Sequence, residues 1–297
     1  MRLSACAATL LLALGCRAPA DGPAVMTPQT AVRPGVQDGY VPSADGVPIH
    51  YHAEGDGSPA LVFVHGWSCD GSYWSEQVRS FSPRHRVVTI DLAGHGTSGR
   101  GRREWTIPAF AQDVRAVIET LNLERVVLVG HSMSGQVILE AARLLPDRVI
   151  ALIPVDTLND VTWKPGKEID DLLESMRRDF PGATREFVKG MFPPGADPDL
   201  VERIASRISG APPEIAVAVL RAVFSFDSAA AMARVRQPIR AINAATYPTQ
   251  VEINRRYAPQ FGAVIIQGTG HFPMLEKPEK FNRLLADAVA DLAPARP

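Results

Sequence analysis

Ser132 and His271 are the residues of this chain whose types and settings could perform nucleophilic catalysis. Ser132 follows the apolar run 126–129 and a Gly-His step, and a helical pattern begins directly after it. A short apolar run is typical of a buried strand, and a sharp strand-to-helix turn strains its central residue and exposes the side chain. Taken alone, Ser132 could equally be a surface serine in an ordinary turn.

A serine hydroxyl needs a base to remove its proton before it can act as a nucleophile. His271 is the candidate base, because it lies in the Gly-rich loop 268–271 that follows another apolar run. A third group must orient the histidine and stabilise its charged form, and this is normally a carboxylate. The candidate acids are Asp156, then Asp160, then Glu252.

Asp156 is favoured because it directly follows the buried run 149–155 and would therefore lie on the strand end next to Ser132. Asp160 fits better as a loop residue. Glu252 falls in a predicted helix, where we expect its carboxylate to be solvated. Asp91 also ends a strand, but its Asp-x-x-Gly-His-Gly setting favours a structural role.

The elements that must position these residues alternate along the chain. A hairpin is predicted over 41–54, and apolar runs predict strands at 59–64, 86–90, 125–129, 149–155, 239–244 and 263–267. Helical patterns cover 72–81, 108–121, 134 to about 145, and 278–292. Such alternation predicts an α/β fold with a doubly wound, mostly parallel sheet, whose carboxyl strand ends carry the chemistry.

The regular alternation of predicted strands and helices stops over 157–236. Helices are predicted there at 168–179, 184–191, 198–209 and 213–225, separated by Pro and Gly and rich in Phe and Met. Some of these apolar side chains are expected to line a water-poor pocket, and the rest to form the segment's own core.

The turn Gly130-His131-Ser132-Met133-Ser134-Gly135 and the loop Gly268-Thr269-Gly270-His271-Phe272-Pro273 together resemble the α/β-hydrolase family. The turn resembles its nucleophile elbow, Gly-x-Ser-x-Gly, with Ser134 in place of the last glycine. The resemblance covers about residues 41–297. It implies that Ser132 is the nucleophile, that His271 is the base, and that 157–236 is a helical cap inserted after the sixth strand.

Acyl transfer also needs backbone N–H donors that stabilise a developing oxyanion. Met133 follows the nucleophile at the start of a helix and is expected to supply one donor. The resemblance implies that Trp67, after His65-Gly66, supplies the second. Members of the family most often place their acid after the strand at 239–244. Here residues 241–250 contain no carboxylate, and Tyr247-Pro248 stands where Asp-Pro is usual, so the acid is predicted to be Asp156, after the sixth strand.

We therefore expect a serine hydrolase that needs no cofactor and no metal and that cleaves an ester, lactone, thioester or related bond of a small apolar acyl substrate. Dehalogenase and epoxide-hydrolase activities are disfavoured, because those relatives carry Asp at the elbow. A cofactor-free haloperoxidase, a carbon–carbon bond hydrolase and a slow-turnover ligand-binding protein remain alternatives.

The 297 residues carry a formal net charge of −1, with 46% hydrophobic and 21% charged residues. This composition is typical of a globular chain, and without a basic patch nucleic acid is not an expected partner. The oligomeric state is not predicted.

The N-terminus predicts export. Residues 1–20 resemble a signal peptide, with Arg2 before an apolar run and two processing sites, Ala18-Pro19-Ala20 and a lipobox-like Ala13-Leu14-Gly15-Cys16. Lipidation of Cys16 would attach the protein to a membrane; otherwise it would be periplasmic or secreted. Residues 21–40 are predicted to be a flexible tether before the domain at 41–297. Cys69 is expected to be a buried thiol.

Overall fold

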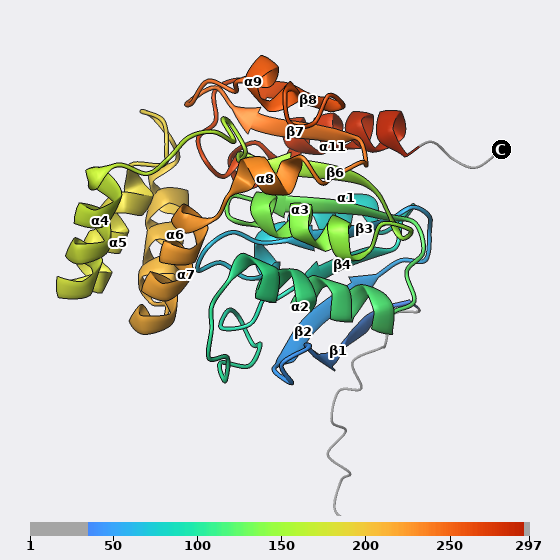
Figure 1. Ribbon diagram of the computed structural model, residues 1–297, viewed down its shortest axis with the longest axis horizontal. Helices are drawn as coiled ribbons and strands as arrows, with labels where there is room; N and C mark the ends of the chain where they lie inside the picture. The colour runs from blue at the N-terminus through green and yellow to red at the C-terminus, as the bar shows by residue number, and fades with distance from the viewer. Residues whose placement is uncertain (1–34, 294–297) are drawn as a thin grey trace, which may run out of the picture. The chain divides into compact units, whose positions relative to one another are not determined.

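Eight strands form a single sheet in the computed structural model, which describes residues 35–293 (Figure 1). In chain order they are β1 (Gln37–Pro42), β2 (Pro48–Glu54), β3 (Ala60–Val64), β4 (Val87–Ile90), β5 (Val126–His131), β6 (Val149–Val155), β7 (Ile239–Ala244) and β8 (Phe261–Ile266). Their spatial order is β1-β2-β4-β3-β5-β6-β7-β8. The predicted signal peptide, including Cys16, lies outside the described residues.

Strands β3 to β8 all run parallel to one another. The two remaining pairs, β1–β2 and β2–β4, are antiparallel. The predicted mostly parallel α/β sheet is therefore confirmed. Strands β3 and β5 are buried along their whole length, as their uninterrupted apolar sequences require. In the register of β5 and β6, His131 pairs with Val155, so the residues that follow them, Ser132 and Asp156, leave neighbouring strand ends.

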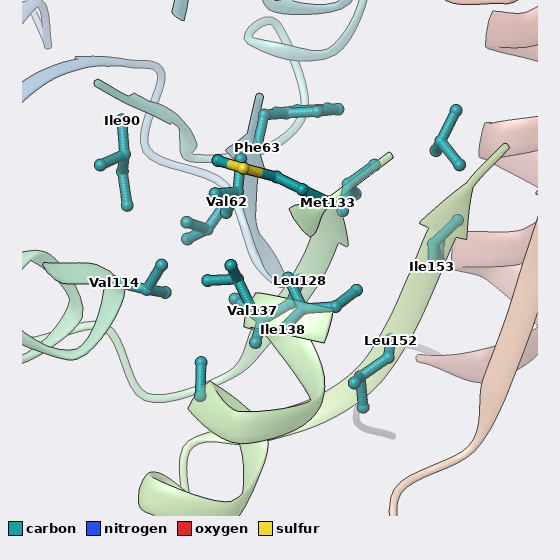
Figure 2. Close-up of a cluster of buried hydrophobic side chains, with 14 of the residues drawn as sticks. Val62, Phe63, Ile90, Val114, Leu128, Met133, Val137, Ile138, Leu152 and Ile153 are labelled. Atoms are coloured by element: carbon teal, nitrogen blue, oxygen red, sulfur yellow. The ribbon is translucent and has the colours of Figure 1, made fainter. Parts of the chain in front are cut away.

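Helices cover both faces of the sheet (Figure 1). One face carries α2 (Ile107–Thr120), α3 (Ser134–Leu144) and α8 (Ser228–Met232), and the other carries α1 (Ser75–Phe81) and α11 (Pro278–Leu292). Between sheet and helices lies the hydrophobic core, where residues such as Val62, Leu128 and Ile138 are completely buried (Figure 2).

The predicted helical segment lies beside the carboxyl ends of the parallel strands (Figure 1). It contains α4 (Lys167–Arg178), α5 (Phe180–Lys189), α6 (Pro198–Ser209) and α7 (Pro213–Ser225), and we call 157–236 the helical insertion. Helix α5 begins four residues before the predicted start, because Asp179 accepts a hydrogen bond from the Gly182 N–H at 3.1 Å and Pro181 fits the first turn.

Over residues 35–293 no single helix has both the length and the apolar composition needed to cross a membrane. The pair α6 and α7 meets these criteria jointly but is bent by 101°.

The boundary of the predicted tether is wrong. Residues 37–40, assigned to the tether, belong to β1, which is the outer strand, while β2 lies between β1 and β4. Most of β1 is exposed and only Val41 is buried, so its sequence has no amphipathic alternation. The strand exists because its backbone pairs with β2, and single-strand patterns do not reveal such pairing.

Candidate active site

The turn between β5 and α3 holds Ser132 in a strained conformation. Ser132 has φ 54°, in the left-handed region that residues with a Cβ rarely adopt. A Cβ on Gly130 would lie 2.4 Å from the Ser134 carbonyl oxygen, and one on Gly135 would lie 2.3 Å from the Thr157 side chain. Both glycines are therefore required for the close approach of strand and helix, and the turn presents a half-buried Ser132 at its apex.

Three side chains from separate parts of the chain meet at this turn. The Ser132 hydroxyl donates to His271 Nε2 over 2.8 Å, and His271 Nδ1–H donates to the Asp156 carboxylate over 2.6 Å. A carboxylate only accepts hydrogen bonds, so Asp156 fixes the tautomer that leaves Nε2 free to accept. The structure thus brings together the predicted nucleophile, base and acid.

Asp156 bridges two strand ends. Its second carboxylate oxygen accepts a hydrogen bond from the backbone N–H of Ala244, the last residue of β7, at 2.9 Å. Asn243, also in β7, binds the Thr157 N–H with its side-chain oxygen at 3.2 Å and the Thr157 carbonyl with its amide at 3.1 Å. Strand β7 therefore positions the candidate acid although it carries no carboxylate itself.

The alternative acids occupy other places. Asp160 accepts hydrogen bonds from the backbone and side chain of Thr162, which closes a local turn. Glu252, in α9 (Val251–Arg255), is exposed and pairs with Arg255. Asp91 accepts from the Gly71 and Thr97 N–H groups and so organises two loops, as its sequence setting indicated.

The electrostatics of the site favour a charged Asp156 and a neutral, buried His131. Burial alone raises the pKa of Asp156, but hydrogen bonds from His271 and Ala244 favour the carboxylate and hold the pKa below its ordinary value of 3.8. Burial lowers the pKa of His131 to about 3, so its ring is neutral. His131 donates its Nε2–H to the His271 carbonyl at 2.7 Å and thus supports the candidate base.

The loop 65–67 is fixed by His65. His65 Nε2 accepts the Leu92 N–H at 3.0 Å, so Nδ1 carries the proton and donates to the Gly66 carbonyl at 2.7 Å. In a trans peptide the carbonyl and the next N–H point in opposite directions, so the Trp67 N–H points away from the His65 ring. A Cβ on Gly66 would lie 3.2 Å from the Ser132 Cβ, which shows how closely this loop approaches the elbow.

Ser134 connects the elbow to this loop. Its hydroxyl donates a hydrogen bond to the His65 carbonyl. The sequence pattern, which shows only Ser134 in place of the last glycine of the elbow, does not predict this bond. Met133, at the N-cap of α3, has its side chain buried in the core, where Figure 2 shows it with Phe63.

The helical insertion touches the site at two points. The Trp67 indole donates to the Ala216 carbonyl of α7 at 2.8 Å, and its ring meets Phe180 and Phe187 edge-on. The His271 N–H donates to the Met191 carbonyl at 3.0 Å. Aromatic side chains of the insertion therefore adjoin the residues around Ser132.

The remaining histidines bind other groups. His50 and His52 share the Asp38 carboxylate at 2.8 and 3.1 Å, and His95 donates to the Ala93 carbonyl. Over residues 35–293 no group of three or more His, Cys, Asp or Glu side chains is arranged to hold a metal ion. Cys69 is buried, as expected.

The chain is similar to known proteins over most of its length. The pattern of the Alpha/beta hydrolase family matches residues 61–284. The chain is 28% identical over 248 residues to the pimeloyl-[acyl-carrier protein] methyl ester esterase of Nitrosomonas europaea, covering 78% of this chain and 96% of the relative. It is 25% identical over 241 residues to the Karrikin insensitive 2 receptor CA of Petunia hybrida, covering 76% and 89%.

Among solved structures, a thermophilic esterase from Thermogutta terrifontis superimposes with a TM-score of 0.75 at 25% identity, covering 86% of this chain and 99% of the esterase. The chain belongs to the alpha/beta hydrolase family, and it is a hydrolase.

Proposed function

We propose that this protein is a serine esterase that cleaves the ester, lactone or thioester bond of a small apolar acyl compound through an acyl-enzyme intermediate. The observation that carries the proposal is the hydrogen-bonded series Ser132–His271–Asp156 at 2.8 and 2.6 Å, with Ser132 at the apex of a strained turn. Nucleophile, base and orienting acid are the groups that acyl transfer requires.

In the first step His271 Nε2 accepts the hydroxyl proton while Ser132 Oγ bonds to the acyl carbon. The carbonyl oxygen becomes negatively charged, and the Trp67 and Met133 backbone N–H groups stabilise it. Loss of one such donor typically costs about 2.7–4 kcal/mol. The intermediate then collapses: the bond from the acyl carbon to the leaving oxygen (sulfur in a thioester) breaks, and the leaving group takes the proton from His271. Water repeats the sequence on the acyl-enzyme, releasing the acid and regenerating Ser132.

The apolar substrate class is supported by the composition of the surroundings. The Trp67 ring is packed against two phenylalanines of the insertion, and Phe192 stacks on Phe272 beside His271 at a ring separation of 5.3 Å. Such walls favour apolar groups and exclude water. The name of the Nitrosomonas relative, a methyl ester esterase, points to the same bond type.

A slow-turnover receptor is the second candidate, because the Petunia relative is named as a receptor. The two functions differ in deacylation. A fast hydrolase regenerates Ser132 on every cycle, whereas a slow-turnover ligand-binding protein would remain acylated long after the first cycle. A haloperoxidase or a carbon–carbon bond hydrolase would use the same three residues, and substrate profiling distinguishes these activities.

The test is a fluorophosphonate probe followed by substrate profiling. We expect the folded protein to be labelled at Ser132, and Ser132→Ala to remain unlabelled. A screen of p-nitrophenyl esters of increasing acyl length, lactones and amides should show sustained turnover of short apolar esters. Absence of labelling in folded wild-type protein would overturn the proposal, and a single-turnover burst would favour the receptor function.

We also propose that the protein is exported, on the basis of the signal-like residues 1–20. The intact mass of the mature protein distinguishes the two processing routes: a diacylated Cys16 at the N-terminus, or an unmodified chain that begins near Asp21. A cytoplasmic protein that retains Met1 would contradict the proposal.

A further inference from the structure

Glu276 holds the two peptide groups on either side of His271. One carboxylate oxygen accepts the Gly270 N–H at 2.8 Å, and the other accepts the Phe272 N–H at 3.0 Å. The side chain is half-buried beneath the loop. A single carboxylate therefore fixes the backbone immediately before and after the base.

The sequence around Glu276 explains how it reaches back to this loop. The short helix α10 (Pro273–Glu276) begins one residue after Phe272, and the N–H groups of Leu275 and Glu276 both donate to the Phe272 carbonyl at 2.9 Å. This tight turn brings the Glu276 side chain beneath the peptides that precede it. Glu276 thus reaches its own loop from five residues after the histidine.

The backbone of His271 itself is also fixed on both sides. Its N–H donates to the Met191 carbonyl at 3.0 Å, and its carbonyl accepts from His131 at 2.7 Å. Together with the two hydrogen bonds to Glu276, these bonds pair the backbone polar groups around His271, and this backbone sets the direction of the imidazole. The imidazole must reach Ser132 and Asp156 simultaneously, and a displacement of about 1 Å in such a group can cost ~100-fold in rate.

The N–H groups of Gly270 and Phe272 can both be paired by a carboxylate at position 276 but not by an amide. Each oxygen of Glu276 faces an N–H group, so glutamine would place its own NH₂ against one of them and leave that donor unpaired. Burial raises the pKa of Glu276 above its ordinary value of 4.5, with a further contribution from Asp156, and this outweighs the two backbone hydrogen bonds and His271, which favour the charged form. Glu276 is thus coupled electrostatically to both Asp156 and His271.

We propose that Glu276 is a positioning residue for the catalytic base: it holds His271 within reach of Ser132 and Asp156 and places a second negative charge near the imidazolium. This inference rests on the proposed function. The nearby titratable groups that share its field are Asp156 and His271.

The test compares the full-length wild-type protein with Glu276→Gln, Glu276→Asp, Ser132→Ala and the matched control Glu279→Gln. Glu279 is an exposed glutamate in the first turn of α11, so its substitution removes the same charge away from the loop. The measured quantities are the fluorophosphonate labelling rate as a function of pH, the melting temperature, and the downfield NMR signal of the His271 Nδ1 proton.

For Glu276→Gln we expect labelling about 10- to 100-fold slower than wild type. We also expect the acid limb of its pH profile to move to lower pH, because a charge that favours the imidazolium is gone. Glu276→Asp keeps the charge but is shorter, and should label at an intermediate rate with little shift of the limb. Glu279→Gln should match wild type in both.

Glu276→Gln that stays folded, labels within about twofold of wild type and keeps the wild-type acid limb would overturn the proposal. If this variant does not fold, Glu276→Asp decides: labelling at the wild-type rate contradicts positioning, and slower labelling supports it. If the wild-type protein itself is not labelled, the proposed function is wrong. The positioning role of Glu276 is then tested by the NMR signal of the His271 Nδ1 proton alone. A shift or loss of that signal in Glu276→Gln supports positioning, and an unchanged signal contradicts it.

Discussion

The carboxylate of Asp156 accepts the backbone N–H of Ala244 at 2.9 Å, which joins the end of β6 to the end of β7. The strand next to the acid thus supplies a hydrogen-bond donor instead of a side-chain carboxylate. Because the other oxygen accepts His271 Nδ1–H, both oxygens of Asp156 face donors and the side chain has one defined orientation.

Asp156→Asn should remove most of the activity. An asparagine amide must point its NH₂ group at either Ala244 N–H or His271 Nδ1–H, and the second arrangement forces the histidine into the wrong tautomer. By analogy with the serine protease acid, we expect a fall of about 10⁴-fold in kcat on a p-nitrophenyl ester.

The matched controls are Asp160→Asn and Glu252→Gln. Asp160 closes a local turn and Glu252 pairs on the surface, so both variants should retain kcat within about twofold. Wild-type turnover by Asp156→Asn, or a large loss in either control, would disprove the assignment of the acid.

Asp156 should also contribute to the pH dependence of stability. Its pKa in the folded state lies below the ordinary value of 3.8, so the stabilisation is complete above that pH and is lost as the pH falls through the lower folded value. The difference in the free energy of unfolding between wild type and Asp156→Asn should therefore shrink below about pH 4. Urea denaturation at a series of pH values measures it. A difference that is independent of pH would contradict this prediction.

Ser134→Ala should slow catalysis without unfolding the protein. The Ser134 hydroxyl bonds to the His65 carbonyl, and His65 in turn orients the peptide that ends in the Trp67 N–H. A hydrogen bond of this kind contributes about 1 kcal/mol, so kcat should fall roughly fivefold while KM changes little.

Ser175→Ala is the control for this change. Ser175 makes the same hydroxyl-to-carbonyl bond, to Leu172 at 2.7 Å, on the exposed side of α4. It should leave kcat unchanged. Equal rates for Ser134→Ala and wild type would show that the elbow and the loop 65–67 are positioned independently.

Arg102→Ala should be strongly destabilising. Arg102 and Asp113 form an ion pair whose side chains are 2% and 0% exposed, and Asp113 also accepts the Ala93 N–H. Removing one partner leaves a buried uncompensated charge, which typically costs about 3–5 kcal/mol. Arg115→Ala, which breaks an exposed pair with Glu119, should cost only about 0.3–0.5 kcal/mol. Chemical denaturation of both variants checks the contrast, and similar losses would refute it.

The sequence predicted the parallel sheet and the neighbouring strand ends of Ser132 and Asp156, because buried strands and their sharp turns are encoded locally. Hydrogen bonds to backbone groups distant in sequence could not be predicted in the same way. Strand β1 forms by pairing with β2, and the supporting roles of His65, Asn243 and Glu276 depend on peptides distant in sequence or on a specific turn. The one available signal was local: Glu276 follows the predicted base by five residues, within reach of its own loop.

The bond from the His271 N–H to the Met191 carbonyl has a consequence for protein engineering. Because the insertion contributes a main-chain atom, the side chain at 191 can be exchanged without removing the contact. The number of residues between α5 and α6 cannot be changed so freely, because the Met191 carbonyl must stay close to the loop of His271. A Cβ on Gly270 would lie only 2.3 Å from that carbonyl oxygen. Libraries that vary side chains between α5 and α6 should retain the base geometry, whereas insertions or deletions there would displace it.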